Sequence, residues 1–180
     1  MALIARIWTI GHSTRDIGDF IAALSGNGIR LVADVRLLPG SKRYPQFNEK
    51  ALADSLGNTQ ISYEHFPELG GRKKPKPDSH NRAWRNEAFR GYADYMETPA
   101  FQHGVERLIA MAQKIGPTAV MCAEAVWWRC HRALISDFLK VRGVEVTHIL
   151  DISKIEPHPF TSAATIVDGQ LSYTGEETLL

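Results

Sequence analysis

Short apolar runs alternate along this chain with stretches in which apolar residues recur three and four positions apart. The apolar runs predict strands, because turn residues and polar residues bound them. They cover residues 7–10, 29–35, 61–66, 118–123 and 144–150. The stretches between them have the periodicity of amphipathic helices, with apolar faces that include Phe20, Leu52, Tyr92, Val105 and Leu134.

Polar residues mark where two of these helices are expected to begin. Ser13, with Asp16 three residues later, forms a weak version of a capping box before the first helix. Thr98 followed by Pro99 predicts a second start, since a threonine cap and a proline at the first helical position favour that geometry.

Strands that alternate with helices favour a mainly parallel sheet covered on both faces. Near the end of the chain, Asp168-Gly169 separates two short extended segments, which is a strong hairpin signal. We therefore predict a single α/β domain over residues 1–180, with helices on both faces of the sheet and a short C-terminal β-hairpin.

Composition narrows the class of protein further. A chain of 180 residues with 44% hydrophobic and 23% charged residues is typical of one globular domain. A net charge of +1 gives no global argument for nucleic acid or for a membrane. Two cysteines are too few for a disulfide framework, which favours a reducing, cytoplasmic location. No apolar stretch approaches the ~20 residues of a membrane span, and we assign no cofactor.

Positive charge is concentrated in one segment. Between Phe66 and Tyr92 there are seven Lys or Arg residues and three acidic residues, together with Gly70-Gly71 and Pro75-Lys76-Pro77. This composition predicts a long, irregular, basic loop. Such a loop is often ordinary solvated surface, but with Trp84 in the same segment it could also contact phosphates or stack on a base.

Chemically capable residues follow four of the predicted strands. They are His12-Ser13 after the first strand, Asp34 and Arg36 at the end of the second, Cys122 and Glu124 at the end of the fourth, and His148 near the end of the fifth. In a parallel sheet these ends meet at one edge, and ligands bind beyond the carboxyl ends of the strands. The pattern therefore predicts a functional site at this edge.

An ordered set of short motifs is similar to a known family. It comprises Thr9-Ile10-Gly11-His12-Ser13-Thr14, Asp34-Val35-Arg36, Pro39 with Ser41-Lys42, Pro45-Gln46-Phe47-Asn48, Leu69-Gly70-Gly71, Gly91-Tyr92, Cys122-Ala123-Glu124, Cys130-His131-Arg132, Val146-Thr147-His148-Ile149 and His158-Pro159-Phe160-Thr161. Over residues 6–173 the chain resembles the bacterial and archaeal "domain of unknown function 488" family. The resemblance implies a fold and a candidate site, but no activity. Where relatives often have a polar loop between the two cysteine motifs, this chain has the apolar and aromatic residues 125–129.

These residues divide into two candidate groups. The candidate catalytic residues are Cys130, Glu124, His12 and Cys122. The candidate substrate- or anion-binding residues are Arg36, Asp34, Ser41, Lys42, His131, Arg132 and Ser13. Cys130 is expected at the start of a helix, where free N–H groups and the dipole favour a thiolate, whereas burial of Cys122 is expected to raise its pKa.

Ordinary structural interpretations compete with these roles. Both cysteines could be small buried residues, Asp34 and Arg36 could form a structural ion pair, and Ser13 could be only a helix cap. Cys122, Cys130 and a histidine could also bind zinc, but the cysteines are not a CxxC pair and we assign no metal. The aromatic Trp127-Trp128 could line a pocket or pack beneath it.

Three functions remain open at this point. The first is an enzyme that acts on an anionic, phosphate-bearing substrate, such as a nucleotide or a nucleic-acid component, with arginines and a helix N-terminus holding the anion. The second is a non-catalytic nucleic-acid-binding module that uses the basic loop 69–90. The third is a metal-binding Cys/His protein.

Overall fold

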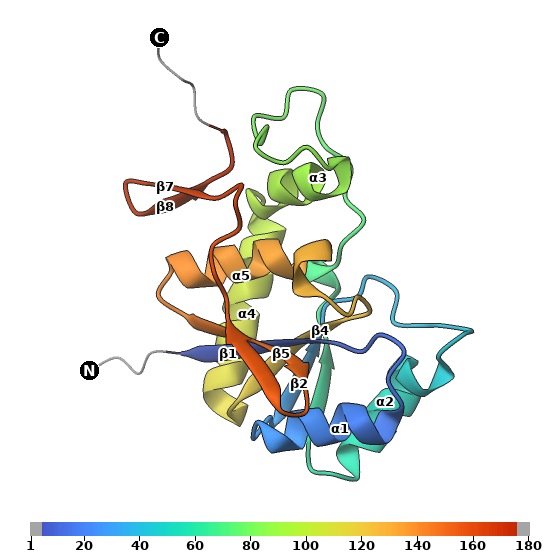
Figure 1. Cartoon of the computed structure of the whole chain (residues 1–180). Helices are drawn as coiled ribbons and strands as arrows, with labels where there is room; N and C mark the ends of the chain where they lie inside the picture. Colours follow the sequence, from blue (N-terminus) through green and yellow to red (C-terminus); the bar gives the residue numbers. More distant parts are fainter. Residues whose placement is uncertain (1–4, 176–180) are drawn as a thin grey trace.

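Six strands form the central sheet in the computed structural model, which describes residues 5–175 (Figure 1). They are β1 (Arg6–Gly11), β2 (Leu31–Asp34), β3 (Ser62–His65), β4 (Thr118–Cys122), β5 (Glu145–Asp151) and β6 (Lys154–Pro157). Their order across the sheet is β3-β2-β4-β1-β5-β6. All neighbouring pairs are parallel except β5 and β6. Every residue of β2 and β4 is buried, as expected for strands covered on both faces.

Five helices cover the two faces of the sheet. They are α1 (Ile17–Gly26), α2 (Glu49–Gly57), α3 (Glu87–Met96), α4 (Pro99–Ile115) and α5 (Arg132–Val141), with short 3₁₀ helices at Pro45–Phe47, Pro67–Leu69 and Trp127–Arg129. The apolar stripes of α1 and α2 share one core cluster with the sheet, and those of α3, α4 and α5 share the other. No helix within residues 5–175 is long and apolar enough to cross a membrane.

The predicted α/β class, with its mainly parallel sheet, is confirmed. Observed strand bounds differ from the predicted ones by one or two residues. The antiparallel edge strand β6 was not predicted, because most of its residues are exposed and no apolar run marks it. The C-terminal hairpin is confirmed as β7 (Thr165–Val167) and β8 (Gln170–Ser172). Its turn residues Asp168 and Gly169 both have positive φ, which is the conformation of a type I′ turn.

One of the two predicted caps is wrong. Asp16, not Ser13, caps α1, and its side chain accepts a hydrogen bond from the backbone N–H of Asp19. Ser13 instead has a positive φ of 49° and donates its backbone N–H to the carbonyl of Ala123. It therefore joins the end of β1 to the loop after β4. Thr98 caps α4 as predicted, and its side chain accepts from the N–H of Phe101.

The adjacent strands β1 and β4 form a topological switch point. The chain leaves β1 toward α1, on one face of the sheet, and leaves β4 toward α5, on the other face. Two loops that diverge from neighbouring parallel strands leave a crevice between them, which is where open α/β sheets bind ligands. The fold thus provides a crevice beside Gly11 and Cys122, the paired last residues of β1 and β4.

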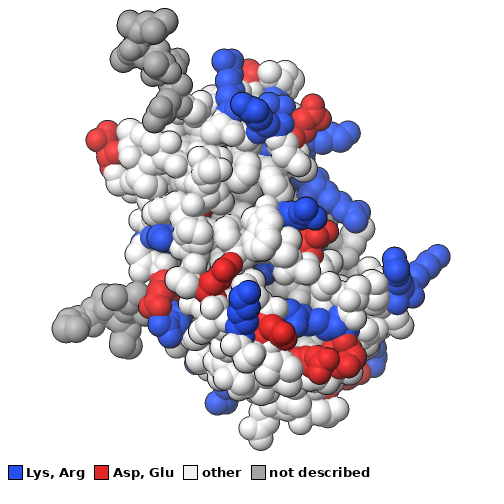
Figure 2. All heavy atoms as spheres, in the orientation of Figure 1, with Lys and Arg blue, Asp and Glu red and all other residues white. Residues whose placement is uncertain are grey.

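The basic segment before α3 is anchored to that helix. The buried Asp94 on α3 accepts hydrogen bonds from the backbone N–H of Lys76, the hydroxyl of Ser79 and the side-chain amide of Asn81. Lys73 lies 4.0 Å from the ring centre of Tyr95. Figure 2 shows most Lys and Arg side chains at the top and on the right of this view, whereas much of the upper left is uncharged. Part of the predicted loop is therefore shaped by specific polar contacts.

Candidate functional site

A cleft of about 640 Å³ occupies the crevice at the switch point. Its lining includes His12 and Ser13 after β1, Arg36 after β2, and Cys122 and Glu124 at the end of β4. Arginine and aromatic side chains from more distant segments complete the walls: Arg72, Arg129, Tyr44, Phe89 and Tyr92. Three of the four predicted strand ends therefore meet in one cavity.

A glycine makes this meeting of loops sterically feasible. A Cβ added to Gly11 would lie 1.7 Å from the carbonyl oxygen of Glu124, a distance that no side chain tolerates. The absence of a side chain lets the β4–α5 loop cross directly over the end of β1. The same carbonyl oxygen accepts a hydrogen bond from Arg132, so Gly11 also helps to shape the polar contacts below the cleft.

Two thiols lie at the floor of the cleft. The sulfur atoms of Cys122 and Cys130 are 2.7 Å apart, which is a close contact but longer than the ~2.05 Å of a disulfide bond. Both side chains are almost fully buried, and both line the cavity. Cys130 precedes α5 by two residues, and the backbone N–H of Arg132 points at its sulfur at 3.4 Å.

The two thiols differ in acidity. Burial would raise the pKa of Cys130, but the hydrogen bond from Cys122 and the charge of Arg132 outweigh it and lower the pKa to about 7. Burial raises the pKa of Cys122, and the neighbouring Cys130 raises it further. These directions match the expectation from the sequence, and they make Cys122 the hydrogen-bond donor and Cys130 the acceptor within the pair.

Arg132 differs from its expected place. It was expected to bind an anion in the cleft, yet it is 1% exposed and lies behind the cysteine pair. Its guanidinium donates to Thr9 Oγ1 at 3.0 Å and to the carbonyl of Glu124 at 2.7 Å. These two acceptors hold the guanidinium outside the cleft lining. Within residues 5–175 no carboxylate forms an ion pair with it.

His131 lies on the other side of Cys130. Its Nε2 donates to the carbonyl of Val35 at 3.0 Å, which leaves Nδ1 facing the sulfur of Cys130 at 3.6 Å. Burial lowers the pKa of His131. Gly71 leaves room for the ring, since an added Cβ there would lie 3.0 Å from Nδ1. A neutral His131 is thus oriented to accept the proton of the Cys130 thiol.

His12 and Arg36 follow β1 and β2 and line the same cleft. His12 stacks on Phe47 with ring centres 4.3 Å apart, and its Nδ1 donates to the carbonyl of Ser13. Burial lowers the pKa of His12, and the nearby charge of Arg36 lowers it further. The neutral ring therefore keeps Nε2 as an acceptor, 3.4 Å from a guanidinium nitrogen of Arg36.

The remaining predicted site residues fall into two groups. Ser41 lines the cleft, whereas Lys42 is exposed and is not part of its lining. Asp34 is fully buried outside the cleft and forms an ion pair with Arg36 at 2.7 Å. Asp34 therefore has the structural role of a buried ion-pair partner, whereas Arg36 also lines the cleft.

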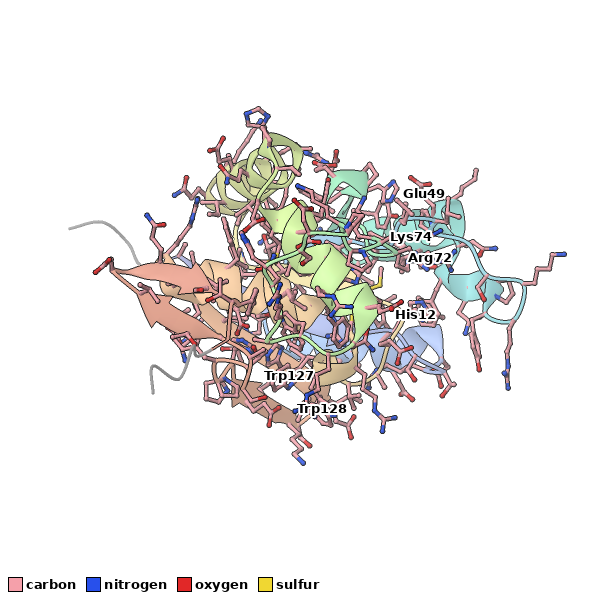
Figure 3. All side chains as sticks on the ribbon, turned by 90° about the horizontal axis from the view of Figure 1, so that it is seen from above. His12, Glu49, Arg72, Lys74, Trp127 and Trp128 are labelled. Carbon is pink, nitrogen blue, oxygen red and sulfur yellow. The ribbon has the colours of Figure 1, made fainter. Side chains whose placement is uncertain are left out.

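The fourth predicted strand end does not reach the cleft. His148 on β5 is fully buried and pairs in register with Thr9 on β1, whose hydroxyl lies 2.6 Å from its Nδ1. Trp127 stacks on the His148 ring with centres 4.5 Å apart, so it packs beneath the cleft and does not line it. Trp128 is half exposed, and Figure 3 shows both tryptophans away from His12 and Arg72.

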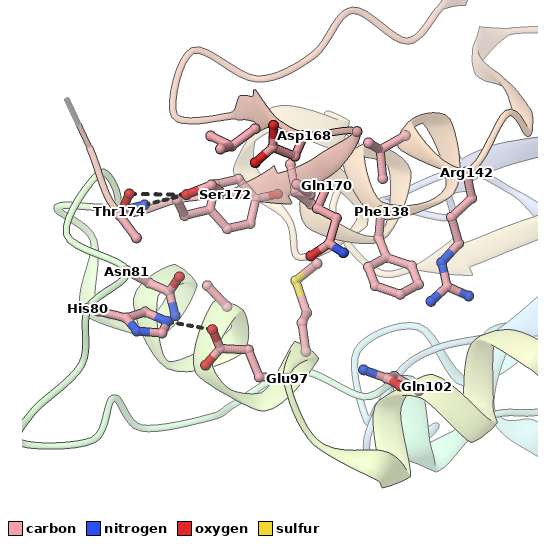
Figure 4. Close-up of a pocket in the computed structure, with 17 residues that line it drawn as sticks. His80, Asn81, Glu97, Gln102, Phe138, Arg142, Asp168, Gln170, Ser172 and Thr174 are labelled. Carbon is pink, nitrogen blue, oxygen red and sulfur yellow. Dashed lines mark hydrogen bonds and ion pairs between the residues drawn. The ribbon is translucent and has the colours of Figure 1, made fainter.

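A second and larger cavity, of about 830 Å³, lies between α3, α5 and the C-terminal hairpin (Figure 4). Its polar lining includes His80, Glu97, Gln102, Arg142 and Gln170, and it contains none of the predicted site residues. Within the part of the chain that the structure describes, no group of three or more His, Cys, Asp or Glu side chains is arranged to hold a metal ion.

Fold and site together define a class of protein: an α/β domain with a thiol pair at the switch point of its sheet. A comparison with sequence families places the chain more closely. Residues 16–139 match the family described as "Domain of unknown function DUF488", and the chain belongs to that family. The match begins after the first motif of the resemblance and ends before the last two. No curated protein and no solved structure matched the chain.

Several cleft residues could not be found from local sequence patterns. Arg72 belongs to an irregular segment and Arg129 to the short 3₁₀ helix Trp127–Arg129, and the return of both to the strand ends depends on tertiary packing. Tyr92 was predicted on a helix face and belongs to the Gly91-Tyr92 motif of the resemblance, but neither pattern predicts that its hydroxyl donates to the carbonyl of Leu69 or that its ring packs beside His131. The basic composition around Arg72 was the signal in the sequence that pointed to this part of the cleft wall.

Proposed function

We propose that this protein is an enzyme that uses Cys130 as a thiolate nucleophile on an anionic, phosphate-bearing substrate of nucleotide size. The observation that carries the proposal is a thiol of lowered pKa on the floor of a cleft, beside a buried arginine without a carboxylate partner among the described residues. A nucleophilic cysteine needs this kind of electropositive surrounding.

The charge of Arg132 supports a thiolate at Cys130. A buried guanidinium stays protonated and needs a nearby anion to offset the cost of its burial. The sulfurs of Cys130 and Cys122 both interact with the Arg132 side chain and raise its pKa. Cys130 has the lower pKa of the two thiols, so the negative charge resides on Cys130 and Cys122 donates a hydrogen bond to it. The thiolate is then the counterion of Arg132.

Two histidines supply the proton transfers. His131 accepts the thiol proton through Nδ1, which faces the sulfur. The thiolate then forms a bond to an electrophilic atom of the substrate, while the electron pair of the broken bond departs with the leaving group, which takes the proton from His131. Water attacks the intermediate, His12 Nε2 takes a proton from that water, and the thiolate of Cys130 is released.

The walls of the cleft support an anionic substrate with an apolar body. Three arginines line it, Arg36, Arg72 and Arg129, against one acidic residue, Glu124. Among residues 5–175 neither Arg72 nor Arg129 takes part in an ion pair, so both guanidiniums can bind a phosphate or carboxylate. Tyr44, Phe89 and Tyr92 offer apolar and aromatic surface for the rest of the molecule.

A pair of alkylating agents tests both halves of the proposal. Iodoacetate carries a negative charge and iodoacetamide does not, while both modify thiolates. We expect Cys130 to prefer iodoacetate, relative to free cysteine, by about tenfold or more, since ~1.4 kcal/mol of electrostatic attraction gives that factor. Mass spectrometry assigns the modified residue.

A matched variant controls for general charge. Arg72→Gln with Arg129→Gln should remove the preference while leaving the rate with iodoacetamide unchanged. As a control, Lys42→Gln and Arg43→Gln remove two exposed charges outside the cleft lining and should leave the preference intact. Equal normalised rates with both reagents in the unmodified protein would refute an anion-binding nucleophile.

A further inference from the structure

A continuous chain of buried hydrogen bonds connects α5 to the floor of the cleft. Asp137 accepts from His158 Nε2 at 2.8 Å, and His158 Nδ1 lies 2.8 Å from His148 Nε2. His148 Nδ1 lies 2.6 Å from Thr9 Oγ1, which in turn accepts from Arg132 at 3.0 Å. All five side chains are at most 2% exposed. The set joins residues from β1, β5, α5 and the segment after β6.

The donors in this series of hydrogen bonds all point toward Asp137. The carboxylate of Asp137 accepts four hydrogen bonds, from His158, from the backbone and hydroxyl of Thr161, and from the hydroxyl of Tyr173. With its proton on Nε2, His158 accepts on Nδ1. His148 must then donate from Nε2 and accept on Nδ1, so the hydroxyl of Thr9 donates to it.

This direction leaves Thr9 with only one role toward Arg132, that of an acceptor. The hydroxyl proton is used by His148, so its lone pairs face the guanidinium. The chain thereby separates two buried charges, with Arg132 at one end and Asp137 at the other, and three neutral side chains between them. A carboxylate in direct contact with Arg132 would instead offset its positive charge and so reduce its effect on the sulfur.

The chain is also held rigidly by packing. Trp127 stacks on the His148 ring, 4.5 Å away and within 6° of parallel, and donates from Nε1 to Glu156. Burial and the neighbouring His158 lower the pKa of His148, so the ring stays neutral. The Nε atom of Arg132 is buried and finds no hydrogen-bond partner among the described residues.

We propose that Thr9, His148, His158 and Asp137 act as positioning residues that fix the guanidinium of Arg132 against the Cys130 sulfur. This inference rests on the proposed function, because it explains how that nucleophile is kept as a thiolate. The other titratable groups that face Cys130 are Cys122 from β4, His131 before α5 and Tyr92 from α3. None of them belongs to the chain, so its effect must pass through Arg132.

A conservative pair of substitutions at Thr9 tests this inference. Thr9→Val keeps the shape of the side chain but removes the hydroxyl between Arg132 and His148, whereas Thr9→Ser keeps the hydroxyl. The rate of Cys130 alkylation is measured between pH 5 and 10. Thr9→Val should raise the apparent pKa by about one unit and slow alkylation at pH 7 about fivefold. Thr9→Ser should behave like the unmodified protein.

A second measurement needs no substitution. Nitrogen-15 chemical shifts of the histidine rings report which ring nitrogen carries the proton. His148 should be neutral, with the proton on Nε2, throughout pH 5–9. A proton on Nδ1 would leave Thr9 without its acceptor and overturn the chain, even if Thr9→Val fails to fold.

The outcomes separate the two proposals. If Cys130 of the unmodified protein titrates like a free cysteine, both the thiolate nucleophile and the positioning chain are refuted. If Cys130 is acidic in the unmodified protein and equally acidic in folded Thr9→Val, the nucleophile stands and only the positioning chain is refuted.

Discussion

The two cavities of this protein differ more in chemistry than in size. The larger one, of about 830 Å³, is walled by helices and the C-terminal hairpin, and several of its polar groups already interact with one another or with aromatic rings. His80 forms an ion pair with Glu97, and Arg142 lies 4.3 Å from the ring centre of Phe138 (Figure 4). The smaller cleft, of about 640 Å³, holds the thiol pair and two arginines without ion pairs in the described chain.

The difference follows from where each cavity lies in the fold. The cleft lies at the carboxyl ends of β1, β2 and β4, where the polar residues after each strand converge. The larger cavity lies outside the sheet and includes the turn and strand residues of β7 and β8. A site for chemistry in an α/β protein is therefore marked by strand ends and available charge, not by volume.

The strongest test of this contrast removes the thiol of Cys130, the proposed nucleophile. Cys130→Ser should abolish the fast alkylation of the cleft and any turnover that depends on it, because a serine hydroxyl does not ionise near pH 7. Gln170→Ala in the larger cavity is the control and should leave both unchanged. Thiol-specific labelling followed by peptide mass spectrometry measures the loss. Full reactivity in Cys130→Ser would assign the reactive thiol to Cys122.

A substitution at Gly11 tests whether the crossing of the two loops shapes the cleft. Gly11→Ala should lower the free energy of unfolding by about 1–3 kcal/mol, as in other overpacked sites, because the new Cβ meets the Glu124 carbonyl. Gly26→Ala is the matched control, since a Cβ there meets nothing within 4 Å. Urea unfolding measures both. Equal stability of the two variants would mean that the loop yields easily.

Two arginines of α5 and its C-terminal end provide a paired test of charge. Arg132→Met removes the cation beside Cys130 and should slow its alkylation at pH 7 roughly tenfold, since the pKa returns toward ~8.5. Arg142→Met, in the larger cavity, should have no effect on this rate. Circular dichroism verifies that both variants are folded. A similar slowing in the two variants would point to a loss of structure rather than of local charge.

Stability should depend on pH through Cys130. Its folded-state pKa of about 7 lies below the ~8.5 of an unfolded cysteine, so its contribution is present above pH ~8.5 and is lost as the pH falls through 7. The raised pKa of Cys122 acts in the opposite sense above pH ~8.5. The unfolding free energy of the unmodified protein minus that of Cys130→Ser should therefore rise between pH 6 and 8.5, by on the order of 1 kcal/mol.

Urea titrations at several pH values measure this difference. A flat difference across this range would contradict an acidic Cys130, since the folded and unfolded states would then bind the same number of protons. Above pH ~8.5 the difference should stop rising, because Cys130 is then deprotonated in both the folded and the unfolded state.

The elements that could be predicted were those set by local pattern. The alternation of strands and helices sufficed to predict a mainly parallel sheet. Because the carboxyl ends of parallel strands meet at one edge, it also predicted that His12 and Cys122 lie at the same site, and both line the cleft. The capping of α1 was missed because Ser13 and Asp16 are both good caps, and the backbone contact of Ser13 with Ala123 decides between them.

Contacts that depend on register and on burial could not be predicted. Thr9 lies opposite His148 only because β1 and β5 are adjacent in the sheet, and that pairing turns His148 away from the cleft. Arg132 was assigned to the cleft because it follows the cysteine motif, but the first turn of α5 directs it below the sheet edge. A local pattern identifies polar residues near a site, and packing decides which of them face the substrate.

The most direct test of the account is the pH dependence of alkylation at each cysteine of the unmodified protein. Iodoacetamide is applied for short times between pH 5 and 10, and mass spectrometry follows both residues separately. The account predicts that Cys130 reacts with an apparent pKa of about 7 while Cys122 stays largely unreacted below pH 9. If Cys130 instead titrates near ~8.5, as a free cysteine does, or if Cys122 reacts first, the thiolate account is contradicted.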